Sequence, residues 1–293
     1  MTTIALLLVT GLGLGALYFL IAAGLSLIWG LMRVLNFAHG AFFTVAAYAG
    51  WSAAKLAGGA DPSLRWLIGV VVAIAVGGLF ATLTEVVLIR PLYARHVGQV
   101  LVTVGLALAT ISLVQGGFGS DPQRLALPAW MTNTTSMLGA NVPNTRLLVI
   151  VVAALVFALL LFFLRRTRFG LIVRAGVENR AMVQALGIDV QRAFTLVFAI
   201  GGMAAGLAGM LGATYYGTVD PLRGTSMLIF AFIVVIIGGL GSVTGSAVAA
   251  IVVGVVQQFL NFYGAAGVGD FSVVLLLAIV LLVRPGGFAG SSA

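Results

Sequence analysis

The sequence predicts an all-α membrane protein, a polytopic bundle of about eight or nine transmembrane segments. Three observations indicate this class. Of the 293 residues, 61% are hydrophobic and only 8% are charged, whereas a soluble domain carries about 25% charged residues. Apolar runs recur along nearly the whole chain, and most approach the roughly 20 residues that a helix needs to cross the hydrocarbon layer. Backbone groups in lipid must be paired within the segment, which favours helices.

The apolar runs define the expected segments in order. They fall at about 4–31, 40–57, 66–89, 97–118, 146–164, 193–213, 226–263 and 269–283. The first run lacks the basic region of a signal peptide, so we expect it to be retained as a helix. The run 226–263 is too long for one span, and glycines that break helices lie at its centre. These are Gly238, Gly239, Gly241 and Gly245. We therefore expect two half-helices or a tight hairpin there, within a single transmembrane domain over residues 1–293.

Basic residues predict the orientation, because positively charged loops are retained in the cytoplasm. With the N-terminus outside and the C-terminus in the cytoplasm, ten of the 15 lysines and arginines are cytoplasmic and five are external. The segment 119–145 becomes an external loop, and the arginine-rich segment 165–192 becomes cytoplasmic. This topology also accounts for the net charge of +8, so we expect no nucleic-acid partner.

Motifs for covalent chemistry are missing from the sequence. The only lysine, Lys55, follows Ala54, so the chain has no Walker A loop to hold nucleotide phosphates. There is no cysteine, and His39 and His96 are far apart in the sequence, so we expect no metal site. No cluster of carboxylates or Ser-His arrangement is present for acid-base or nucleophilic work, so we do not expect an enzyme. Energy from ATP would have to come from a partner.

The cytoplasmic segment 165–192 predicts a short helix from about Leu171 to Leu186 that ends at Gly187. Val173, Val177 and Met182 can share its apolar side, as in a helix that lies parallel to the membrane surface. The pattern alone leaves two interpretations open. The segment is either an ordinary amphipathic surface helix or a coupling helix that inserts into a groove on a soluble ATPase.

Polar residues interrupt the apolar runs at two places. Asn36 and His39 lie between the first two spans, where Asn36 could cap a helix and His39 reach the aqueous interface. Alternatively, both line the inner end of a translocation pathway. Gln257 and Asn261 lie four residues apart on one helix face. Hydrogen bonds between helices and contact with a transported substrate explain these two equally well.

Charged residues at the ends of other runs have simpler expected roles. Glu85 and Arg90 flank the inner end of the third span, and we expect both to be interfacial anchors. Asp220 precedes Pro221, and we expect it to cap a helix or to contact an external partner.

Five stretches of the sequence carry a resemblance to a known family. They are AAGLSLIWGLMRVLNFAHGAFFTVAAY over 22–48, TRFGLIVRAGVENRAMVQALGID over 167–189, FAIGGMAAGLAGMLGATYYGTVDP over 198–221, GGLGSVTGSAVAAIVVGVVQ over 238–257 and RPGGFAG over 284–290. Together they resemble the permease subunits of branched-chain amino acid ABC importers, specifically the smaller of the two paired permeases.

The resemblance implies a subunit of the bacterial-type inner membrane, surrounded by lipid, that imports small amino acids by ATP-driven alternating access. It implies two ATP-binding subunits that hold ATP and Mg, a related second permease and an external substrate-binding protein, with no cofactor in this chain. It also implies that six residues of the cytoplasmic segment couple the permease to the ATPase. They are Gly170, Arg174, Ala175, Asn179, Ala181 and Gly187.

Other transport functions stay open at this point. The same superfamily handles urea, short amides and sugars, so a permease for one of these solutes is an alternative. An ion-coupled secondary transporter, with substrate at the broken helix, is another. The small number of acidic residues in the spans argues against ion coupling.

Overall fold

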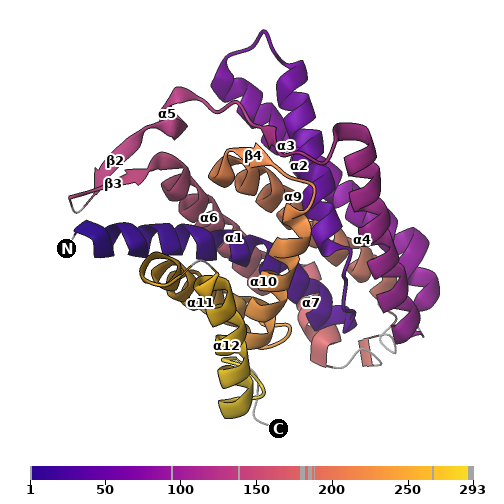
Figure 1. The fold of residues 1–293 in the computed structure, drawn as a ribbon. Coiled ribbons are helices and arrows are strands. Elements are labelled where there is room, and N and C mark those ends of the chain that lie inside the picture. Colours follow the sequence, from indigo (N-terminus) through magenta and orange to yellow (C-terminus); the bar gives the residue numbers. More distant parts are fainter. Residues whose placement is uncertain are drawn as a thin grey trace.

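The computed structural model describes residues 2–93, 95–137, 139–178, 182–183, 187, 189–265 and 267–289. Long helices dominate this part of the chain (Figure 1). They are α1 (Thr2–Met32), α2 (His39–Leu56), α3 (Pro62–Thr84), α4 (His96–Phe118), α6 (Asn144–Arg166), α9 (Val190–Tyr216), α10 (Arg223–Gly238), α11 (Val243–Tyr263) and α12 (Val268–Val283). Shorter elements are η1 (Glu85–Ile89), η2 (Arg90–Leu92), α5 (Ala129–Thr132), α7 (Arg168–Glu178), β1 (Gln123–Arg124), β2 (Thr134–Met137), β3 (Ala140–Pro143) and β4 (Thr218–Val219).

Six stretches of the described chain are long enough and apolar enough to cross a membrane. They are α1, α3 continued through η1 and η2, α4, α6, α9 and α11. The helices α10 and α12 are apolar but have 16 residues each, which span about 24 Å at 1.5 Å per residue, less than the ~30 Å hydrocarbon layer. A helical membrane protein is thus confirmed, whereas the expected eight or nine segments exceed the six that meet these criteria.

Close helix packing depends on small residues. Helix α3 packs along α9, and α1 packs along α11. A side chain built at Gly77 would overlap the backbone of Gly202, and one at Gly254 would overlap the backbone of Gly11 and Gly15. Small residues let helix backbones approach in lipid, where apolar surface gives no driving force for association. These contacts therefore determine which helices are neighbours.

The predicted helix break is present between α10 and α11. Helix α10 ends at Gly238, and φ is positive at Gly239 (95°) and Gly241 (87°), a region that favours glycine. Helix α11 begins after Ser242, whose Oγ accepts a hydrogen bond from the Gly245 amide at 3.0 Å. The C-terminal segment covers the end of α10, because the Ala289 amide donates to the Gly238 carbonyl at 3.1 Å.

The bundle has two distinct ends. At one, here called the hairpin end, lie the start of α1, the β2–β3 hairpin and the β1–β4 pair (Figure 1). The segment 119–145 is structured there: the Trp130 indole donates to Ser63 Oγ at 3.3 Å, and the Trp51 indole donates to the Arg124 carbonyl at 2.9 Å. At the other, here called the α7 end, lie α7, η2, the α10–α11 turn and the C-terminal segment.

Helix α7 begins earlier than the sequence predicts. It starts at Arg168 instead of Leu171, because the Gly170 amide donates to Thr167 Oγ1 at 2.9 Å and so caps the first turn. The helix continues to Glu178, and residues 179–181 and 184–186 are outside the described residues. Val173 is buried and Met182 is 61% exposed. A side chain exposed on the protein alone can face lipid, so the shared apolar side stays a prediction.

Candidate translocation cavity

A cavity of about 450 Å³ opens between six helices at the hairpin end. It is lined by residues from α1, α6, α9, α10, α11 and α12, so no short segment of sequence contains it. Each of the six helices contributes at least one side chain with a polar group, and Leu14, Met227 and Phe230 supply apolar surface. A space of this size falls in the roughly 300–1,000 Å³ range of small-molecule sites.

Gln257 lies at the centre of a hydrogen-bonded chain in this cavity. The Tyr18 hydroxyl of α1 donates to Gln257 Oε1 at 2.7 Å, and Gln257 Nε2 donates to Asp270 Oδ1 of α12 at 2.7 Å. Tyr18 also stacks on Phe230, with 5.0 Å between ring centroids. Gln257 is 3% exposed, and a buried amide needs such partners. The chain therefore ties α1, α11 and α12 together along the cavity.

Asn261 lies one turn beyond Gln257, also on the cavity wall. Its side chain packs against Gly269, where a Cβ atom would overlap the amide group. The glycine therefore allows α12 to approach α11 at this level. The structure thus brings both polar residues of α11 together at one cavity, and their part in translocation stays a prediction.

Two arginines that the sequence reading did not select also line the cavity. The Arg146 guanidinium lies over the Tyr215 ring, 3.3 Å from its centroid, and donates to the Tyr215 carbonyl. Arg223 lies over Tyr216 at 4.1 Å and pairs with Asp220, with 3.6 Å between Nη2 and Oδ2. Cations over aromatic faces are held by the ring quadrupole.

The two arginines differ in their acidic partners. Among the described residues no carboxylate pairs with Arg146, and its Nε is buried without a hydrogen-bond partner. Arg223 pairs with Asp220, which also accepts from the Leu222 amide at 2.8 Å in the turn before α10. The N-cap of α10 is Leu222 and no side chain caps this helix, so the expectation that Asp220 caps a helix is wrong, and its contact with an external partner stays a prediction. Within the part of the chain that the structure describes, the cavity therefore contains one arginine that forms no ion pair.

Asn36 and His39 lie at the start of α2, and neither lines the cavity. Both are fully buried, so the expectation that His39 reaches the aqueous interface is wrong. Asn36 Oδ1 accepts from the Ala38 amide at 3.1 Å in the turn before α2. The N-cap of α2 is Ala38 and no side chain caps this helix, so the expectation that Asn36 caps it is wrong. The His39 ring packs against Gly24 of α1 and meets the Phe42 ring edge-on at 5.6 Å.

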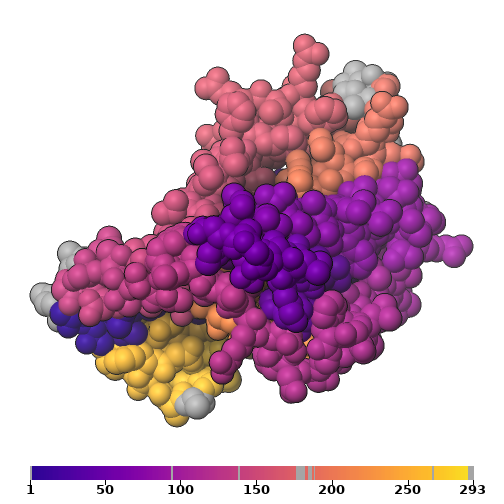
Figure 2. Space-filling view, turned by 90° about the horizontal axis from the view of Figure 1, so that it is seen from above, coloured from indigo at the N-terminus to yellow at the C-terminus, as the bar shows by residue number. Residues whose placement is uncertain are grey.

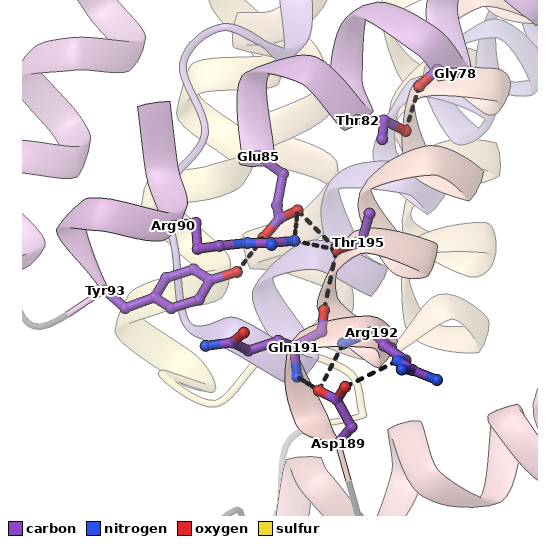
Figure 3. Close-up of polar contacts among 9 residues, drawn as sticks. All are labelled: Gly78, Thr82, Glu85, Arg90, Tyr93, Asp189, Gln191, Arg192 and Thr195. Carbon is purple, nitrogen blue, oxygen red and sulfur yellow. Dashed lines mark hydrogen bonds and ion pairs between the residues drawn. The ribbon is translucent and has the colours of Figure 1, made fainter. Parts of the chain in front are cut away.

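A second polar site, the Glu85 cluster, consists of Glu85, Arg90, Tyr93 and Thr195 and joins the end of α3 to the start of α9 (Figure 3). Arg90 Nη2 lies 3.1 Å from Glu85 Oε2, and the Thr195 hydroxyl lies 2.8 Å from each of these atoms. The Tyr93 hydroxyl donates to Glu85 Oε1. Burial and this hydrogen bond raise the pKa of Tyr93 above its usual value, so the phenol stays protonated.

The Glu85 side chain has no exposed area, while that of Arg90 is 34% exposed. The expectation that Glu85 is an interfacial anchor is therefore wrong. Glu85 begins η1, a single turn of π-helix, and such turns interrupt the regular α-helical register. The carboxylate is buried because three neighbouring side chains satisfy both of its oxygens, which a single-sequence reading of α3 does not show.

The residues expected to couple to an ATPase lie at the α7 end. Gly170 packs against the backbone of Phe163 and Leu164, and a Cβ atom there would overlap it. Arg174 is exposed, Ala175 is half-buried, and Gly187 has a positive φ of 75°, as a C-cap glycine would. Asn179 and Ala181 lie outside the described residues.

A hollow of about 750 Å³ separates this corner from α9, lined by Phe163 and Phe169 on one side and Thr195 and Leu196 on the other. Figure 2 shows α7 and the end of α6 standing out from the body of the molecule beside the start of α9. Asp189 caps α9 there, accepting from the Gln191 amide at 3.0 Å (Figure 3). Within the described ranges, no three His, Cys, Asp or Glu side chains come together in a way that could hold a metal ion.

Comparison with known proteins relates the whole chain to one family. Residues 7–284 match the model of the permease component of branched-chain amino acid transport systems. The high-affinity branched-chain amino acid transport system permease protein LivH of Salmonella typhimurium is 29% identical over 96% of this chain and 93% of its own. BraD of Pseudomonas aeruginosa, of the same description, is 31% identical over 97% and 94%. A probable LivH of Methanocaldococcus jannaschii is 26% identical over 92% and 88%. The chain therefore belongs to the family of permease components of branched-chain amino acid transport systems, and it is a membrane transport subunit, not an enzyme.

Proposed function

We propose that this chain is the membrane-spanning subunit of an ABC importer that moves branched-chain amino acids into the cell by ATP-driven alternating access. The family membership supports the class of transporter. The observation that carries the proposal is the cavity between six helices, which combines hydrogen-bonding groups with apolar surface. That combination suits a small amino acid with a hydrocarbon side chain.

The proposed complex has the remaining parts of such an importer. Two ATP-binding subunits hold ATP and Mg, a related second permease completes the pathway, and an external substrate-binding protein delivers the solute. The whole chain is one transmembrane domain in a bacterial-type inner membrane. The hairpin end, with the loop 119–145, faces outside, and the α7 end, with the segment 165–192 and the C-terminus, faces the cytoplasm. The distribution of arginine and lysine supports this orientation.

In this proposal the pathway begins at the hairpin end, where Gln257 and Asn261 line the open cavity. Asn36 and His39 belong to the closed inner barrier, because both are fully buried and His39 packs tightly against Gly24. Inward opening must separate these contacts. Polar side chains at such a depth are costly unless they serve a pathway or a cap.

Coupling to ATP hydrolysis is proposed to pass through the corner between α6 and α7. Gly170, Arg174, Ala175, Asn179, Ala181 and Gly187 belong to this segment. The corner is stiff, because Thr167 caps α7 and Gly170 packs directly on the end of α6. Nearby, the Glu85 cluster ties α9 to α3. Closure of the ATPase subunits on α7 would therefore move α6 directly, with α9 and α3 following as one unit.

The test is reconstitution of the complex from native membranes. This chain should co-purify with two ATPase subunits and a second permease, and vesicles supplied with ATP should take up leucine, isoleucine or valine when the binding protein is added. Proton and sodium ionophores should leave uptake largely intact. If the vesicles take up urea or short amides and no branched-chain amino acid, the proposed substrate is wrong. Uptake that needs an ion gradient and no ATP would establish a secondary transporter.

A further inference from the structure

We propose that the cavity at the hairpin end contains a subsite for the charged head group of a free α-amino acid, with Arg146 receiving the carboxylate and Asp270 the ammonium group. This inference rests on the proposed function and adds to it the residues that would recognise the substrate within the permease itself. Selection would then not be left entirely to an external binding protein.

Arg146 has the properties of a carboxylate receptor. Stacking on Tyr215 and the hydrogen bond to the Tyr215 carbonyl fix the guanidinium in place, but they leave most of its five N–H donors unused. No described carboxylate pairs with it. An arginine without a counter-ion, two residues into α6, is costly in a largely apolar chain. A bidentate carboxylate would neutralise it.

Asp270 offers the complementary group. Its Oδ1 accepts from Gln257, while Oδ2 has no partner among the described residues and the side chain lines the cavity. Arg146 and Asp270 both line this one cavity. Opposite charges therefore face one space from α6 and α12, as the two ends of a zwitterion require.

The rest of the cavity fits an apolar side chain. Leu14, Met227 and Phe230 line it together with the two charged groups. Arg223 contributes less to recognition, because Asp220 already neutralises it. A transport subsite must bind well enough to admit a solute and weakly enough to release it, so we expect weak binding and a strong dependence on both charges of the solute.

The absence of cysteine in the chain permits a direct test. Ser226→Cys places one thiol on the cavity wall, and the assembled importer in detergent is labelled with a maleimide. Leucine should slow labelling several-fold. Leucinamide, which lacks the carboxylate, and 4-methylpentanoate, which lacks the ammonium group, should not. Equal protection by all three compounds, or by none, would overturn the subsite.

Variants in the same background assign the two charges. Arg146→Gln and Asp270→Asn should each abolish protection by leucine, and Arg146→Lys should keep part of it. Arg124→Gln is the matched control, because Arg124 lines a different cavity at the same end of the molecule. In this variant leucine should slow labelling as much as it does in the parent Ser226→Cys protein. Full protection in Arg146→Gln would remove Arg146 from the subsite. If Arg146→Gln does not fold, the comparison of leucine with leucinamide in the parent decides alone.

Leucine uptake is measured on the same preparations to separate this inference from the proposed function. An importer that transports leucine without any protection at Ser226→Cys would refute the subsite and leave the proposed function standing. An importer that transports no branched-chain amino acid would refute the proposed function.

Discussion

The cavity and the Glu85 cluster are both polar sites in an apolar bundle, but they differ in how completely their charged groups are paired. In the Glu85 cluster the carboxylate is fully buried and both oxygens have partners from η2, Tyr93 and α9. In the cavity, no described carboxylate pairs with Arg146, and Asp270 has a described hydrogen-bond partner at only one of its two oxygens. A completed network fixes the helices that it joins, whereas an incomplete one can receive a ligand. The comparison separates a structural joint from a binding site.

Breaking the completed network should have the largest effect on stability. Glu85→Ala leaves the Tyr93 and Thr195 hydroxyls without their buried acceptor, and each hydrogen bond to a charged group contributes about 1.5–3 kcal/mol. Arg90 loses its carboxylate as well. We expect a large fall in the unfolding midpoint of the detergent-solubilised complex, with loss of uptake. Arg192→Ala is the control, because the Arg192–Asp189 pair is exposed and such pairs contribute only about 0.2–1 kcal/mol. Equal losses in the two variants would show that the Glu85 cluster is not the stronger joint.

The packing beside the cavity should also be sensitive to small changes. Gly254→Ala places a methyl group against the backbone of Gly11 and Gly15, and overpacking costs about 1–3 kcal/mol. Gly105→Ala on α4 meets no atom within 4 Å and should be neutral or stabilising by up to ~1 kcal/mol, because alanine favours the helix. Unfolding midpoints measure both. A stable Gly254→Ala variant would mean that α1 and α11 are less closely packed.

Interrupting the cavity's hydrogen-bonded chain should affect transport more than stability. Gln257→Met retains much of the side-chain volume but leaves the Tyr18 hydroxyl and Asp270 without their partner, at a cost of about 1–2 kcal/mol. Kinetics of leucine uptake should show a raised KM, because Asp270 loses the group that orients it. Uptake with an unchanged KM would indicate that Gln257 serves helix packing alone.

The smallest effect is expected from thiol probes of orientation. Leu171 and Asn133 are both exposed and lie at opposite ends of the bundle, so Leu171→Cys and Asn133→Cys should leave the unfolding midpoint unchanged. An impermeant thiol reagent should label the first only from the cytoplasmic side and the second only from outside. The reverse pattern would invert the topology and assign the cavity to the cytoplasmic face.

The sequence by itself determined the features that arise from neighbouring residues. Apolar runs predicted the long helices because each must pair its own backbone in lipid. The glycines at 238–245 predicted the break between α10 and α11, and the spacing of Gln257 and Asn261 placed them on one face. Helix α7 starts three residues before the predicted Leu171, because the Thr167 hydroxyl caps its first turn.

The tertiary structure alone decided which polar residues meet. Tyr18 and Gln257 are 239 residues apart, and Glu85 and Thr195 are 110 apart, so no local pattern could pair them. Arg146 read from the sequence is one more charge at the end of an apolar run, and Glu85 looks like an anchor at the interface. Their roles depend on whether a partner charge lies within a few ångströms after the helices have packed. Burial and charge pairing are properties of helix packing, not of position in the chain.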